Sequence, residues 1–219
     1  MKYMTRILSV VIALLAALPA VAAPRKAAAR NVADGSPDFA YPQTVQAQAA
    51  KSMRESAKKG DMQGVVAAAV QTVVASDLIS NENAPRMATL LDSLAQASDQ
   101  PSKAILYSLE AELYTQMYEA DRWTYNDRVV PLTPVPANPQ EWSAELYALK
   151  VHDLVGKSVE PADALQAIPA GDYRKLLSDY SEFDANFYPT LYSVLAQRAI
   201  GMLSDFTGGN EAIPFEGVG

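Results

Sequence analysis

The sequence predicts an all-α protein: an array or bundle of about six or seven antiparallel helices, tetratricopeptide-like in its helix pairing, after a cleaved signal peptide. Three observations favour this fold class. The chain has 219 residues, 49% of them hydrophobic, which suffices for one domain with a substantial core. Its apolar residues recur at helical spacing along most of the chain. Helix-start signals, in which Asp or Asn shortly precedes Pro, occur at 83–85, 99–101 and 138–139.

Composition excludes several classes of function. The formal net charge is −7, and an acidic chain repels phosphate backbones, so a nucleic-acid partner is not expected. The chain has no cysteine and a single histidine, His152. Disulfide frameworks, thiolate nucleophiles, iron–sulfur sites and multi-histidine metal sites are therefore excluded, and no cofactor is expected.

Residues 1–22 have the pattern of a secretory signal peptide. A positively charged start and an apolar run over 7–18 precede the small-x-small cleavage site Ala20-Val21-Ala22. The run is shorter than the ~20 residues of a membrane span. We therefore expect cleavage after Ala22 and an exported protein, periplasmic or extracellular, that is associated with the cell envelope without stable membrane insertion. An N-terminal anchor helix is the alternative.

The rest of the chain divides by composition. Residues 23–42 include Gly35, Ser36 and Pro37, which interrupt any helix, and they are predicted to form a linker. Residues 43–207 are predicted to form the helical domain. Residues 208–219 are glycine-rich and lack a helical period, which indicates a linker or the truncated start of a following domain.

Two predicted helices open the domain. The first covers 43–59, and the second covers 61–79, where valine and alanine recur at helical spacing. Gly60 and Asp61 separate them, because Gly suits the C-terminal end of a helix and Asp suits the N-terminal end. A third helix is expected to begin after Asn83 as its cap, with Pro85 in its first turn, and to carry the apolar stripe Met87, Leu90, Leu91 and Leu94.

The helix predicted over 101–120 has two apolar stripes, one of leucine and methionine and one of tyrosine and alanine. A helix that is apolar on two sides packs between neighbours, so we expect it to be the central helix. Three prolines exclude a helix over 129–138, and this segment is predicted to be a long extended connection.

The dipeptide Asn138-Pro139 predicts the start of the next helix, which is expected to run to residue 155. Shorter helical pieces are predicted over 161–167 and 172–180, and a last helix over 189–207. The two apolar sides of the helix after Asn138 are expected to carry Trp142, Leu146 and Leu149 on one side and Tyr147, Val151 and Leu154 on the other.

Three stretches of the chain together resemble one known family. They are PSKAILYSLEAELY over 101–114, DRW over 121–123 and YPTLYSVLAQRAI over 188–200. In order and spacing, with Trp142 between the second and the third, they resemble the N-terminal helical region of the large alpha-2-macroglobulin-family proteins exported by Bacteroidetes. Tyr188 and Gln197 depart from the family pattern, which often has arginine and histidine at these positions.

The resemblance implies a non-enzymatic helical scaffold or interaction domain, placed before the modules of an envelope-associated protease-inhibitor family. Inhibition in that family belongs to macroglobulin domains, a bait segment and sometimes a thioester, which requires a cysteine that this chain lacks. The implied partner is a protein, either the downstream macroglobulin domains or another envelope protein. The alternative is a stand-alone periplasmic helical-repeat protein that binds glycan or peptide through its tyrosines.

A candidate interaction or structural patch combines residues after the central helix with two from later helices: Arg122, Trp123, Asp127, Arg128, Trp142 and Arg198. Tryptophan and arginine are enriched in interface hot spots, which favours a recognition role. The preferred interpretation is structural. In it, Trp123 covers the end of the core, and the charges tie down the proline-rich connection.

Other candidates also have structural interpretations. Glu110 and Glu112 lie on different sides of a helix, so they do not form a catalytic carboxylate pair, and one of them is expected to pair with an arginine of the patch. His152 is expected to be a packed or surface residue. The tyrosines are expected to be core residues with hydroxyls at the edge rather than a glycan-binding platform. They are Tyr107, Tyr114, Tyr118, Tyr125, Tyr147, Tyr188 and Tyr192.

Overall fold

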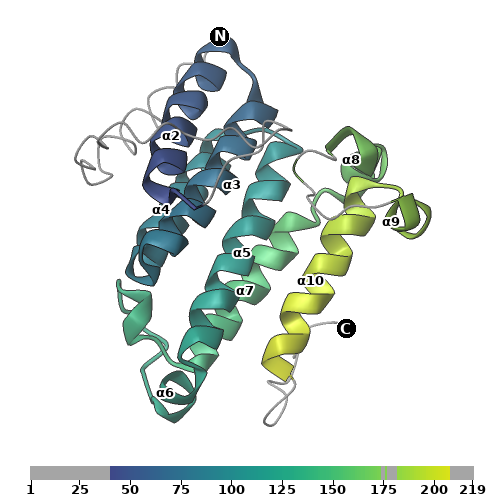
Figure 1. Ribbon diagram of the computed structural model, residues 1–219. Coiled ribbons are helices and arrows are strands. Elements are labelled where there is room, and N and C mark those ends of the chain that lie inside the picture. Colours follow the sequence, from purple (N-terminus) through teal and green to yellow (C-terminus); the bar gives the residue numbers. More distant parts are fainter. Residues whose placement is uncertain (1–39, 174–175, 177–181, 208–219) are drawn as a thin grey trace. The chain divides into compact units, whose positions relative to one another are not determined.

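Figure 1 shows the computed structural model, which describes residues 40–173, 176 and 182–207. Over these residues the protein is all-α, as predicted, with nine α-helices, three short 3-10 turns and no strand. An isolated bridge joins Pro169 and Thr190. The signal peptide expected at 1–22, most of the linker expected at 23–42, and the tail at 208–219 lie outside the described residues.

The chain forms two compact units. Of the described residues, those up to Leu106 belong to the first unit together with Tyr173 and Leu176, and the remainder belong to the second. The boundary falls inside helix α5 (Ser102–Ala120), which contributes its N-terminal end to the first unit and the rest to the second.

A helical hairpin forms most of the first unit. Helix α2 (Pro42–Lys59) packs against α3 (Met62–Ile79), close to the predicted bounds. Gly60 ends α2 with a φ of 73°, a left-handed conformation that glycine adopts without strain. The Asp61 carboxylate accepts a hydrogen bond from the backbone N–H of Gly64 at 2.9 Å and caps α3. The predicted junction between the two helices is therefore confirmed.

Contacts between α2 and α3 are mainly apolar. Val45, Ala49 and Met53 of α2 are buried, which confirms its apolar face. A buried polar contact accompanies them, because Gln46 Nε2 donates to Ser76 Oγ at 2.6 Å.

Among the described helices, α3 has the length and hydropathy that a membrane span requires. Core helices of soluble proteins pass the same test. Because α2 packs along α3, these properties are weak support for a membrane location.

Helix α4 (Ala84–Ala97) follows the short turn η1 (Asn81–Asn83). Asn83 takes the predicted N-cap position of α4, but without the hydrogen bond that such a cap usually makes. Its Nδ2 donates instead to the carbonyl of Ser76 at 3.3 Å. The predicted apolar stripe is confirmed by the burial of Met87, Leu90, Leu91 and Leu94.

In the second unit, α5 leads into α6 (Arg122–Asp127) and then into a non-helical connection over 128–138, as the prolines predict. Helix α7 (Ala144–Ser158) starts later than expected. The Asn138 side chain caps a separate 3-10 turn, η2 (Pro139–Glu141), by accepting from the N–H of Gln140 at 3.1 Å. Ser143 caps α7 instead. Asn138 and Pro139 therefore do start a helical element, but that element is the turn η2 and not the helix α7.

The apolar sides of α7 also differ from the prediction at one position. Leu149 is 47% exposed, so it does not belong to a buried side. The other predicted positions are buried: Trp142, Leu146, Tyr147, Val151 and Leu154.

Three further helices complete the second unit: α8 (Ala162–Gln166), α9 (Glu182–Phe187) and α10 (Leu191–Thr207). Helix α10 packs against α7 and α8. Helix α9 has no counterpart in the prediction. The turn η3 (Ala170–Tyr173) covers the start of the piece predicted over 172–180, most of which lies outside the described residues.

Candidate interaction surface

An aromatic cluster joins α5, α6 and α7. Tyr114 stacks on Trp142, with ring centroids 5.4 Å apart and planes 5° apart. Tyr147 packs edge-on against both rings, at 6.4 and 5.3 Å. The rings of Tyr118 and Tyr125 lie 6.0 and 4.8 Å from Tyr147. All five side chains are buried, so the prediction that tyrosines form core is confirmed for these four, whereas Tyr107, Tyr188 and Tyr192 are half-buried. The expectation that the hydroxyls lie at the edge of the core is wrong for Tyr147.

The hydroxyl of Tyr147 lies inside this cluster. Its side chain is fully buried, and the hydroxyl makes no hydrogen bond of ordinary geometry to the described residues. Burial is the main cause that raises the pKa of Tyr147 above its ordinary value, and the neighbouring Tyr125 hydroxyl adds to the rise. By contrast, the Tyr118 hydroxyl donates to Asn126 Oδ1 at 2.9 Å. The cluster therefore contains tyrosine hydroxyls in two different states of hydrogen bonding.

Side-chain hydrogen bonds tie the proline-rich connection to the chain before α7. The Arg128 guanidinium donates to the carbonyls of Gln140 and Trp142, the second at 3.2 Å. The indole N–H of Trp142 donates to the carbonyl of Pro136 at 2.7 Å. Arg128 also lies 5.5 Å from the ring centroid of Tyr125. The prediction that charges tie down this connection is confirmed for Arg128.

Large apolar side chains are exposed on α6 and on the anchored connection. They are Trp123, 81% exposed, Val129, 97% exposed, Leu132 and Val135, and we call these four residues the α6 surface. The interpretation that Trp123 covers the core is wrong, because a new helix begins at Arg122 and buries Tyr125 instead. Exposed apolar groups on an anchored segment are typical of surfaces that bind other proteins.

The charged groups beside the α6 surface are engaged to different degrees. Arg122 pairs with the carboxylate of Glu119 at 3.5 Å, and Arg128 is held by the two carbonyls already described. Both cations are therefore engaged within the chain. The exposed carboxylates of this segment are those of Asp121, Asp127 and Glu141.

Two glutamates of α5 form ion pairs with two different helices. Glu112 pairs with Arg198 of α10 at 2.5 Å, and Arg198 Nε donates to Ser108 Oγ at 3.0 Å. Glu110 is buried and pairs with Lys150 of α7 at 3.0 Å. The expected pairing of one of these glutamates with a patch arginine is confirmed. Lys150 was missed, since the sequence does not give the register between α5 and α7.

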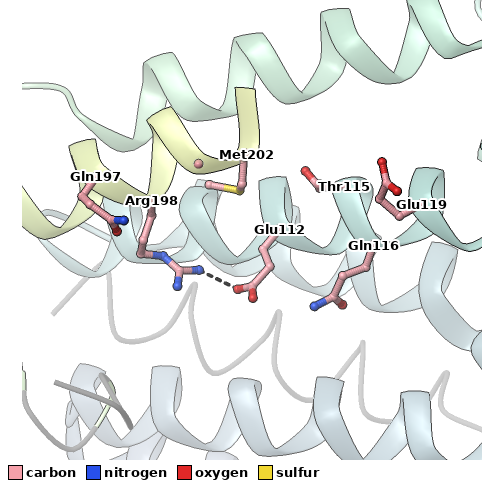
Figure 2. Close-up of a pocket in the computed structure, with 8 residues that line it drawn as sticks. Glu112, Thr115, Gln116, Glu119, Gln197, Arg198 and Met202 are labelled. Atoms are coloured by element: carbon pink, nitrogen blue, oxygen red, sulfur yellow. Dashed lines mark hydrogen bonds and ion pairs between the residues drawn. The ribbon is translucent and has the colours of Figure 1, made fainter. Parts of the chain in front are cut away.

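A groove of about 360 Å³ lies between α5 and α10, and Figure 2 shows its lining residues. Most of these residues are polar or charged, but apolar atoms make up the larger part of the groove's surface. The ion pair between Glu112 and Arg198 crosses the groove. Sequence analysis missed this groove because it forms where two helices distant in the chain lie side by side. Its lining is Glu112, Thr115, Gln116 and Glu119 from α5, and Gln197, Arg198, Gly201 and Met202 from α10.

The remaining candidate, His152, is exposed on α7, as expected for a surface histidine. No group of His, Cys, Asp and Glu suited to a metal ion occurs in the described part of the chain. The surface features that the described residues present are the exposed apolar side chains of the α6 surface and the groove between α5 and α10.

Comparisons of the chain with protein-family models, curated proteins and solved structures found no match. The family resemblance of the three motifs therefore stays a prediction. The described residues define an all-α protein.

Proposed function

We propose that this chain is a non-enzymatic scaffold and interaction domain at the N-terminus of an exported alpha-2-macroglobulin-like protein. In this proposal the signal peptide is removed after Ala22, the helices pair in a tetratricopeptide-like manner, and the domain acts in the periplasm or outside the cell at the envelope. The observation that supports the interaction role is the α6 surface, in which Trp123 and Val129 are more than four-fifths exposed on an anchored segment.

The energetics of association favour such a surface. An ordered binding segment loses little conformational entropy when a partner docks, so more of the apolar contact energy appears as affinity. Arg128 and Trp142 hold the connection in place before any partner binds. Tryptophan is also among the residues that most often dominate interface energies. The ion pairs of Glu110 and Glu112 serve helix packing, which agrees with a scaffold role.

The coding sequence beyond Gly219 tests the macroglobulin part of the proposal. We expect it to encode β-rich macroglobulin modules, and calorimetry is expected to show that these modules, purified separately, bind the helical chain. A stop codon directly after Gly219 would contradict the proposal. So would modules that bind the Trp123→Ser variant as tightly as the original chain.

A second candidate is a stand-alone periplasmic protein that binds peptide or glycan. The groove between α5 and α10 favours it, because polar and charged residues line the groove and apolar atoms make up much of its surface. Burial argues against the version in which the core tyrosines form the binding platform. We expect calorimetric titration with peptides and oligosaccharides to give heats that disappear in a Gln116→Ala, Gln197→Ala variant. Flat titrations with both ligand classes would remove this candidate.

A further inference from the structure

We infer that the α6 surface binds a protein segment in which lysine or arginine side chains flank apolar ones. This inference rests on the proposed interaction role and specifies its partner. Two independent properties of the surface lead to it: the arrangement of its apolar side chains and the sign of the charge beside them.

The apolar part comes from consecutive stretches of one segment. Trp123 lies on α6, while Val129, Leu132 and Val135 follow along the extended connection. The connection is held near its start by Arg128 and near its end by the bond from Trp142 to the Pro136 carbonyl. The backbone that carries Val129, Leu132 and Val135 is therefore held at both ends before a partner binds.

The charge beside these groups is negative. Arg122 pairs with Glu119, and Arg128 stays positively charged while its guanidinium is hydrogen-bonded to backbone carbonyls. Residues 119–141 carry four carboxylates against two guanidinium groups, a net charge of −2. The carboxylates of Asp121, Asp127 and Glu141 are exposed. Cationic side chains of a partner would be attracted here, whereas an acidic protein segment, a phosphate backbone or an anionic lipid head group would be repelled. The net charge of −7 for the whole chain adds to this preference.

The test uses two synthetic peptides as probes and the purified full chain. One peptide carries lysine on both sides of a leucine and phenylalanine core, and its twin carries glutamate in place of every lysine. Binding is measured by fluorescence anisotropy at low and physiological salt. We expect the lysine peptide to bind more tightly than the glutamate peptide, and more weakly as salt is added.

Two variants locate the binding. Trp123→Ser with Val129→Ser removes apolar contact, and we expect the lysine peptide to bind about tenfold more weakly. Asp127→Asn with Glu141→Gln removes charge at nearly constant shape, and we expect weaker binding that depends less on salt.

Matched controls change apolar residues or carboxylates on exposed positions of α3 and the turn after it. They are Val74→Ser with Leu78→Ser, and Asp77→Asn with Glu82→Gln, and neither is expected to change binding. Circular dichroism of every variant checks that the helices are retained.

Three results would overturn the inference. The lysine peptide could fail to bind, it could bind all variants equally, or the glutamate twin could bind as tightly. In the last case a loss of binding in the Trp123→Ser, Val129→Ser variant would leave the interaction role standing and remove only the charge assignment. Failure of the proposed function would be recognised in a different experiment, which measures whether the modules encoded downstream bind the chain.

Discussion

Replacing Tyr147 by Phe should raise the free energy of unfolding. The side chain is fully buried, and its hydroxyl makes no hydrogen bond of ordinary geometry to the described residues. Burying a polar group in this way costs about 1–3 kcal/mol. Removing the oxygen also removes a few dispersion contacts worth ~0.1–0.2 kcal/mol each. The net expectation is a gain of about 1 kcal/mol, or roughly 2–4 °C in Tm for a chain of this size.

The two tryptophans make the measurement specific. Trp142 packs against Tyr147 and reports on the aromatic cluster, whereas Trp123 is exposed and reports on solvent. In a Trp123→Phe background, Trp142 is the remaining tryptophan, so urea unfolding followed by its fluorescence gives the stability of the unit that contains the cluster.

Tyr118→Phe is the matched control. The Tyr118 hydroxyl donates to Asn126 Oδ1, so its removal should lower the free energy of unfolding by about 1 kcal/mol. The two substitutions delete the same atom type and are predicted to have opposite signs. If Tyr147→Phe destabilises the protein as much as Tyr118→Phe does, the Tyr147 hydroxyl has a partner and the reasoning is refuted.

Three further predictions follow from the contacts described above. A double-mutant cycle of Arg198→Met and Glu112→Gln should give a coupling energy of about 1 kcal/mol or less, because both side chains are partly exposed. A coupling energy of zero would show that this ion pair does not help to hold α5 against α10. Gly60→Ala should lower the free energy of unfolding by about 1 kcal/mol, since φ is positive there, whereas Gly156→Ala in α7 should be neutral or stabilising in the same urea assay. Because the pKa of Tyr147 is raised in the folded state, the folded chain keeps a proton that the unfolded chain loses above pH ~10. The free energy of unfolding should therefore fall above that pH, by up to ~1.4 kcal/mol per pH unit. Urea unfolding at several alkaline pH values should show this extra decline in the original chain but not in Tyr147→Phe.

Local rules were sufficient for much of the fold. The helical spacing of small and apolar residues predicted α2, α3 and α5 nearly to the residue, because each of these helices is long and carries the spacing over several turns. Gly60 and Asp61 acted as predicted because capping depends on neighbouring backbone groups alone. The prolines excluded helix from the connection for an equally local reason.

The errors arose where the outcome depends on contacts between distant residues. Asn138 and Ser143 are both good caps, and the sequence alone does not say which of them starts the long helix. The exposure of Trp123 depends on the direction in which α6 leaves α5, which the burial of Tyr125 determines. The partner of Glu110 depends on the register of α5 against α7. Periodicity identifies a face of a helix but does not identify its neighbour.

The anchoring of Arg128 also affects how the chain meets trypsin-like proteases. Such enzymes must take an arginine side chain into their specificity pocket before they hydrolyse the following peptide bond. Val129, on the other side of that bond, is 97% exposed, yet the guanidinium is hydrogen-bonded to two carbonyls of its own chain. Cleavage here first requires the segment to open locally. The bond before this exposed valine is thus protected by the hydrogen bonds of the arginine side chain rather than by burial of the valine.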